Sequence, residues 1–176
     1  MNDLRFPIGP FRYEGPAAPE QIQEWIQTIQ DTPAKLRQAV AGLTDDQLDT
    51  PYRPEGWTVR QVVHHMADSH MNSFIRFKLT LTEETPTIRP YEEARWAELG
   101  DSRETPIEMS LALLDALHQR WTILLTSLTE EQFQREFRHP EHNALFDLKK
   151  ALALYAWHSE HHIAHITTLK EREGWK

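Results

Sequence analysis

Apolar residues recur every three or four positions in four long stretches of the chain, the spacing that places them on one face of an α-helix. The first stretch runs from about Pro19 to Ala41, and Pro33 should kink or split that helix. The second begins at Thr58, where Gln61 completes a capping box, and continues to about Thr82.

The third stretch has the clearest helix start, with Thr105 as the expected N-cap, Pro106 at the first helical position and Glu108 closing the box. The fourth runs from about Asp147 to Glu173, and Gly174 follows as a typical helix stop. Residues 1–18 combine prolines and glycines with aromatic side chains, so we expect an extended arm that packs along the surface. A short surface helix is predicted within Tyr91–Leu99.

A short internal repeat indicates how these helices are arranged. Leu43–Leu48 (LTDDQL) matches Leu128–Phe133 (LTEEQF), and each copy follows a long helix and precedes a proline-containing loop and a histidine-bearing helix. A shared capping solution would also give this six-residue match. We predict an all-α fold in which residues 1–176 form one domain, an up-down four-helix bundle with short extra helices and an N-terminal arm. The second and fourth long helices should face each other.

Composition narrows the function. The net charge of −8 and pI of about 5.7 argue against nucleic acid or an acidic membrane surface as a partner. The N-terminus lacks a signal pattern and no apolar run reaches membrane-spanning length, so we expect a soluble cytoplasmic protein. With no cysteine, a transition metal would be held by imidazole and carboxylate groups, which suits zinc, nickel, iron or copper.

The candidate chemistry lies in Trp157–Ile166, which reads WHSEHHIAHI and holds four of the ten histidines. His162 falls in the apolar stripe and His158 at its edge, one helical turn apart, so the two side chains can bind one ion. His161 points off the stripe. This is not the zincin motif HExxH, because Ser159 follows His158 and Glu160 projects away from the pair. A buried helix face without a metal is the alternative.

A third ligand is expected on the second long helix. Periodicity predicts that His64 is solvated but does not decide between His65 and His70. His118 is either a core residue or a hydrogen-bond partner of a ligand. His139 and His142 are expected in an exposed loop.

Two segments, GWTVRQVVHHMADSH (56–70) and WHSEHHIAHI, resemble the signatures of the DinB/YfiT-like superfamily, and the similarity extends from PIG near the start to GW at the end. The YfiT branch is most similar. The resemblance implies a four-helix bundle, a homodimer and one divalent metal ion per chain, zinc first and nickel second. It assigns the ligands to His65, His158 and His162; the last two are the pair that spacing selects independently.

Three functions follow from this site. The first is a metal-dependent hydrolase that activates water for attack on a small-molecule substrate. The second is a bacillithiol-type S-transferase, in which the metal binds a low-molecular-weight thiol that replaces the missing cysteine. The third is a non-catalytic metal-binding bundle. No protein base is assigned. Side chains that could orient a ligand, contact an anionic substrate or hydrogen-bond the metal-binding imidazoles are Ser69, Asn72, Arg76, Glu160, His161 and His165.

Overall fold

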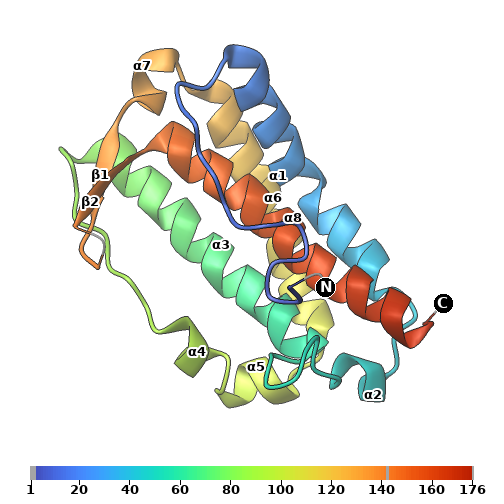
Figure 1. Ribbon diagram of the computed structural model, residues 1–176. Coiled ribbons are helices and arrows are strands. Elements are labelled where there is room, and N and C mark those ends of the chain that lie inside the picture. The colour runs from blue at the N-terminus through green and yellow to red at the C-terminus, as the bar shows by residue number, and fades with distance from the viewer. Residues whose placement is uncertain (1–2, 142, 176) are drawn as a thin grey trace.

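The computed structural model describes residues 3–141 and 143–175. It confirms the predicted all-α four-helix bundle (Figure 1). The long helices are α1 (Pro19–Val40), α3 (Val59–Thr82), α6 (Ile107–Ser127) and α8 (Leu148–Glu173). The short helices in the connections are α2 (Asp45–Leu48), α4 (Glu93–Trp96), α5 (Gly100–Glu104) and α7 (Glu130–Phe133). No helix in the described ranges is both long enough and apolar enough to cross a membrane.

The order of the helices around the bundle differs from simple up-down alternation. Both α1 and α3 pack against α6 and α8, so α1 lies diagonally opposite α3, and α6 lies diagonally opposite α8. Met66 and Leu114, nearer the starts of α3 and α6, lie in one core cluster. Phe77 and Trp121, nearer the ends of the same helices, lie in the other cluster. The two helices therefore run in the same direction. The cause is the connection 83–106, which returns along the bundle before α6 begins (Figure 1). As expected, α3 and α8 are neighbours.

Both copies of the repeat carry a capping box. Thr44 with Gln47 caps α2, and Thr129 with Gln132 caps α7, at opposite ends of the bundle (Figure 1). The expected N-cap of α6 is wrong, because Pro106 occupies that position and Thr105 makes no side-chain cap. The Thr105 carbonyl instead accepts hydrogen bonds from two α3 side chains, Arg60 at 3.2 Å and His64 at 3.0 Å.

The loop expected before α8 contains a β-hairpin. Strands β1 (Glu136–His139) and β2 (Ala144–Asp147) pair antiparallel, with Phe137 opposite Phe146 and their rings stacked 5.7 Å apart. Four-residue strands are too short to show an alternating pattern of apolar and polar residues in the sequence. His139 therefore lies on a strand and is partly buried, contrary to the expected exposed loop, whereas His142 lies outside the described residues.

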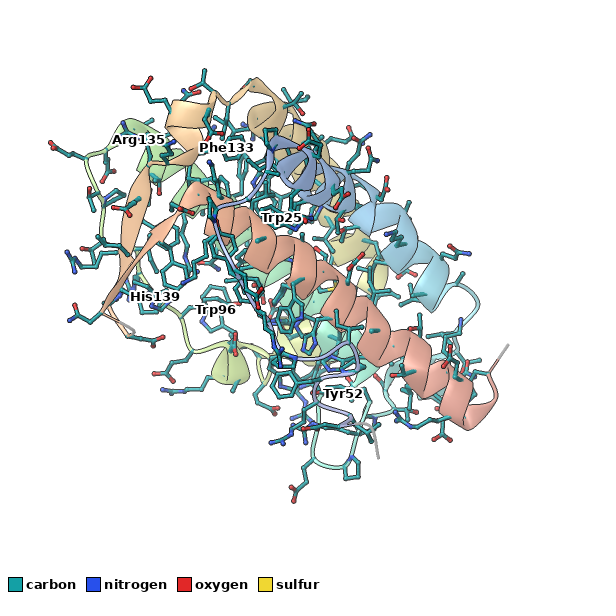
Figure 2. The ribbon with its side chains drawn as sticks, turned by 45° about the horizontal axis from the view of Figure 1, so that its top comes forward. Trp25, Tyr52, Trp96, Phe133, Arg135 and His139 are labelled. Carbon is teal, nitrogen blue, oxygen red and sulfur yellow. The ribbon has the colours of Figure 1, made fainter. Side chains whose placement is uncertain are left out.

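The core divides into two clusters along the bundle axis. One surrounds Trp121 and includes Phe133; the other surrounds Met66 and includes Tyr52. Figure 2 shows Phe133 and Tyr52 toward opposite ends of the molecule. Helix α1 continues through Pro33 without splitting. The N-terminal arm packs along the surface, as predicted. It follows α8, where its Phe11 ring packs 5.9 Å from Trp157.

Candidate metal centre

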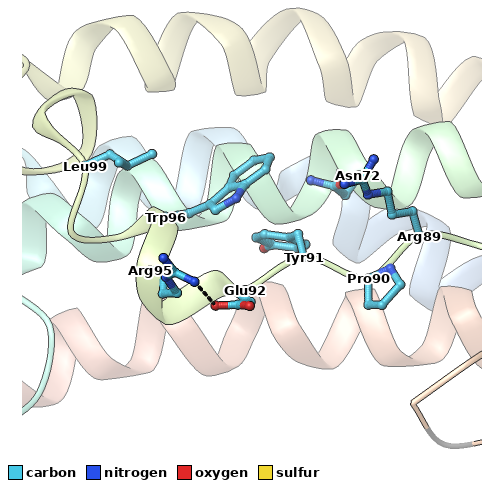
Figure 3. Close-up of a pocket in the computed structure, with 8 residues that line it drawn as sticks. All are labelled: Asn72, Arg89, Pro90, Tyr91, Glu92, Arg95, Trp96 and Leu99. Carbon is cyan, nitrogen blue, oxygen red and sulfur yellow. Dashed lines mark hydrogen bonds and ion pairs between the residues drawn. The ribbon is translucent and has the colours of Figure 1, made fainter.

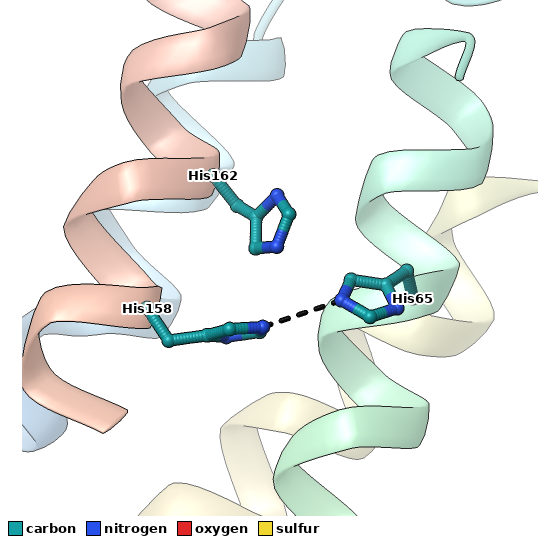
Figure 4. Close-up of side chains that lie close together, drawn as sticks. All are labelled: His65, His158 and His162. Atoms are coloured by element: carbon teal, nitrogen blue, oxygen red, sulfur yellow. Dashed lines mark hydrogen bonds between the residues drawn. The ribbon is translucent and has the colours of Figure 1, made fainter. Parts of the chain in front are cut away.

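Helices α3 and α8 bring three imidazoles together, one from α3 and two from α8 (Figure 4). His65 Nε2 lies 3.2 Å from His158 Nε2. The His162 ring centroid is 4.8 Å from that of His65 and 4.4 Å from that of His158. One ring nitrogen from each of the three lies within 4.8 Å of the others. The three side chains proposed from the resemblance therefore converge on one point.

Local structure explains this convergence. His158 and His162 are one turn apart on α8, so both rings project from the same face. Thr58 starts α3 about two turns before His65, which places that ring at the same level of the bundle. The Trp57 indole packs 4.6 Å from the His65 ring and 6.4 Å from the His162 ring, and so holds both from the side.

Burial keeps these imidazoles neutral. It lowers the pKa of His65 to about 4, with a smaller contribution from repulsion by His161 and His165. Burial also holds the pKa of His158 and of His162 well below the usual 6.5, and the neighbouring imidazoles add to the effect. Neutral imidazole is the form that ligates a metal, and each of the three rings keeps one nitrogen lone pair at neutral pH.

The separation of His65 and His158 fits a tetrahedral ion. Zinc–imidazole bonds of about 2.0–2.1 Å at tetrahedral angles place two ligand nitrogens roughly 3.3–3.4 Å apart. The two Nε2 atoms of His65 and His158 are 3.2 Å apart, close to that value. Three imidazoles also leave a fourth position for a small molecule, the pattern of catalytic zinc sites.

A second trio, His161, His162 and His165, also has nitrogens within 4.8 Å of one another. His165 Nδ1 lies 3.3 Å from His162 Nδ1, and His165 Nε2 lies 3.1 Å from the Arg5 carbonyl oxygen. Both nitrogens of His165 therefore already have hydrogen-bond partners within the protein. The same is true of His158, whose Nε2 lies 3.2 Å from His65 and whose Nδ1 lies 3.0 Å from His70, so these contacts do not distinguish the two trios.

A cavity of about 470 Å³ opens onto the three histidines. Tyr52, Trp57 and Trp157 contribute aromatic walls. Arg5, Arg53, Glu55 and Glu93 contribute charged groups of both signs. A small polar molecule can therefore reach the imidazoles from solvent, and His158 keeps some exposure on this side.

Several other predictions about single residues are corrected. His64 is not solvated: it is buried, with Nδ1 2.7 Å from Ser110 Oγ. His161 was expected to point away but is buried, since the Phe6 ring of the arm packs 5.8 Å from it. As predicted, Glu160 is exposed and points outward; it pairs with Lys35 at 3.8 Å.

The polar candidates on α3 do not line the cavity at the three histidines. Ser69 is buried and its Oγ lies 3.2 Å from Tyr155 Oη. Asn72 lines a different cavity of about 680 Å³, beside Tyr91 and Trp96 (Figure 3). Arg76 donates to the Arg89 carbonyl at 3.2 Å. The structure does not bring Asn72 or Arg76 to the site, and among the described residues the Asn72 cavity has no histidine in its lining.

Comparison with known proteins places the chain in a family. Residues 28–166 match the model of the DinB superfamily. The chain belongs to the DinB superfamily. Within it, the chain is 59% identical over 173 residues to the Bacillus subtilis (strain 168) protein named "Putative metal-dependent hydrolase YfiT", covering 98% of this chain and 97% of the relative. A Bacillus cereus (strain B4264) relative of the same descriptive name is 57% identical over 175 residues, covering 99% and 100%.

A solved structure agrees with this DinB assignment. The structure of YfiT from Bacillus subtilis superposes with a TM-score of 0.97 at 59% identity, covering 98% of this chain and 99% of that one. It is described as having "an unusual four-helix bundle topology". In this chain, α3 and α6 run in the same direction. The family resemblance read from the two histidine segments is confirmed.

Proposed function

We propose that the protein is a metal-dependent hydrolase in which His65, His158 and His162 hold one divalent ion, with zinc the first candidate and nickel the second. The observation that carries the proposal is the convergence of three neutral imidazoles on one point beside an open cavity. The names of the Bacillus relatives, which describe metal-dependent hydrolases, support it.

The protein's own groups have defined tasks. Three neutral ligands leave the ion its full charge, and a bound divalent ion supplies Lewis-acid polarisation and lowers the pKa of water toward about 7. Trp57 packs against the His65 ring and forms part of the cavity wall. Arg5 and Arg53 present cationic groups to a substrate that enters the cavity. A small molecule with a hydrolysable ester or amide bond suits this arrangement.

Metal analysis tests the ligand set. We expect about one ion per chain in the purified wild type, and at most about a tenth of that in His158→Ala and His162→Ala, because two imidazoles make a weak site. His161→Phe is the matched control, since it removes an imidazole of the second trio from the same helix. Loss of metal in His161→Phe with retention in His158→Ala would reverse the assignment.

Activity assays test the reaction. The metal-loaded protein should hydrolyse a panel of small esters and amides, and a chelator should abolish turnover until zinc or nickel is restored. A parallel assay supplies a low-molecular-weight thiol and an electrophile, because a chain without cysteine could take its sulfur nucleophile from a substrate. Metal-dependent thiol conjugation without hydrolysis would replace the hydrolase proposal by the S-transferase one.

A further inference from the structure

A buried chain of hydrogen bonds connects α1 to the candidate metal centre. The His118 Nδ1 atom lies 2.6 Å from the Ile29 carbonyl oxygen. His118 Nε2 lies 2.7 Å from His70 Nδ1, and His70 Nε2 lies 3.0 Å from His158 Nδ1. His70 and His118 are 0% and 1% exposed, so water does not compete for these contacts. The chain ends on the ring nitrogen of His158 that faces away from His65.

The first hydrogen bond of this series depends on a proline in α1. In a regular helix the Ile29 carbonyl would accept a hydrogen bond from the backbone N–H of residue 33. Residue 33 is proline, which has no N–H, and α1 nevertheless continues through it. The Ile29 carbonyl is thereby released from the helix ladder, and His118 of α6 supplies its donor.

The carbonyl fixes the direction of every hydrogen bond in the chain. An oxygen of this kind only accepts, so His118 carries its hydrogen on Nδ1 and has a lone pair on Nε2. His70 must then donate from Nδ1, which leaves its Nε2 as an acceptor. His158 therefore donates from Nδ1, and its Nε2 carries a lone pair. If the order were reversed, the Ile29 oxygen would face a lone pair and His158 Nε2 would carry a hydrogen.

We propose that His70 and His118 are positioning residues that hold His158 as its Nδ1–H tautomer and thereby direct the Nε2 lone pair at the metal ion. The proposal rests on the proposed function for the identity of the site. Partners of this kind on metal-bound histidines fix the tautomer and ring orientation, and their loss typically weakens metal binding about 10–100-fold.

The other ligand from α8 is held in the same way. His165 Nε2 lies 3.1 Å from the Arg5 carbonyl oxygen, so it carries the hydrogen and leaves a lone pair on Nδ1. His162 Nδ1, 3.3 Å away, then donates, and its Nε2 is free for the metal. Each α8 ligand is thus set by a chain that ends on a backbone carbonyl. In the metal-free protein the remaining ligand, His65, must supply the hydrogen in its 3.2 Å contact with His158.

Nitrogen NMR of the metal-free wild type tests the tautomers directly. With ¹⁵N-labelled histidine side chains, we expect Nδ1–H for His70, His118, His158 and His162, and Nε2–H for His65. His165 should be Nε2–H. A His158 signal showing the hydrogen on Nε2 would overturn the proposal. This measurement needs no metal, so it still tests the tautomers if the protein binds no metal ion. Failure to bind a metal would refute the proposed function but not the tautomer assignment.

Zinc affinity tests the consequence. Competition with a chromophoric chelator should show binding about 10–100-fold weaker in His70→Leu. His70→Gln should stay within about threefold of wild type, because its amide oxygen accepts from His158 and its amide N–H donates to His118. His64→Leu removes another buried, hydrogen-bonded histidine of α3 and should also stay within about threefold. Equal affinity in His70→Leu and wild type would refute the positioning role, and if that variant does not fold, the tautomer pattern decides.

Discussion

The indole Nε1 of Trp157 donates a hydrogen bond to the carbonyl oxygen of Gly9 at 3.1 Å. This bond joins the N-terminal arm to α8 next to the candidate ligand His158. The same arm supplies the Phe6 ring against His161 and the Arg5 carbonyl that accepts from His165. The arm is therefore part of the wall of the site, and its attachment influences access to the imidazoles.

Trp157→Phe should loosen this arm while leaving the bundle folded. The variant keeps an aromatic ring for packing and loses one hydrogen bond, typically about 1 kcal/mol. Hydrogen–deuterium exchange should show faster exchange in residues 3–12 and little change in the middle of α3. Trp25→Phe is a suitable control, because Trp25 packs on Tyr13 of the arm and no side-chain hydrogen bond joins the pair. Unchanged exchange in the arm of Trp157→Phe would show that packing alone holds it.

Arg60 should be the most costly ion-pair residue to replace. Its side chain is 7% exposed and donates to Asp49 at 2.7 Å, to Asp45 at 2.9 Å and to the Thr105 carbonyl at 3.2 Å, joining α2, α3 and the start of α6. Arg60→Met leaves that carbonyl with one donor fewer, and we expect a loss of about 2–3 kcal/mol in the free energy of unfolding.

Urea denaturation measures that loss, and Arg95→Met provides the control. Arg95 forms an ion pair with Glu92 at 3.1 Å, but its side chain is 80% exposed. Exposed pairs contribute between about 0 and 1 kcal/mol, so the control should lie close to wild type. A cost for Arg95→Met as large as that for Arg60→Met would contradict the importance of burial here.

The sequence was sufficient to predict features that depend on residues close together in the chain. The Thr58–Gln61 box and the His158–His162 pair lie within one helix each, so propensity and spacing are sufficient to find them. His65 and His70 could not be separated by periodicity because both reach His158: His65 contacts its Nε2, and His70 contacts its Nδ1. Only the position of α8 shows that His65 is a candidate ligand and that His70 is the hydrogen-bond partner of His158.

Features that depend on the path of the connections were missed. His64 looks solvated on the helical stripe, yet Ser110 and the Thr105 carbonyl cover it because α6 begins beside α3. The common direction of α3 and α6 follows from the long segment 83–106, and no periodic pattern reports where such a segment runs. The role of Pro33 in releasing the Ile29 carbonyl also required knowledge that α6 brings His118 to that position.

Metal binding should stabilise the fold. An ion that binds only the folded state at 100 times its dissociation constant adds about 2.7 kcal/mol to the free energy of unfolding. We expect zinc to raise the thermal midpoint of chelator-treated wild type by several degrees and to leave His162→Ala unchanged. An equal rise in His162→Ala would place the stabilising ion elsewhere.

Acid should destabilise the metal-free protein through His118. Burial lowers the pKa of His118 to about 4, against the ordinary 6.5 that applies in the unfolded chain. Above pH 6.5 neither state binds the proton and the residue contributes no pH dependence. Between about 6.5 and 4 the unfolded chain binds it and the folded chain does not, so the free energy of unfolding falls by up to about 1.4 kcal/mol per pH unit.

Urea titrations at pH 7.5, 6.0 and 5.0 in the presence of a chelator measure this slope. Other buried histidines titrate in the same direction, since burial also lowers the pKa of His65 to about 4. His118→Gln should therefore reduce the slope below pH 6.5 by about 1 kcal/mol per pH unit without abolishing it. The amide of glutamine can still donate to the Ile29 carbonyl, so stability at pH 7.5 should change less than stability at pH 5.0. A slope identical to that of wild type would show that His118 is already protonated in the folded protein.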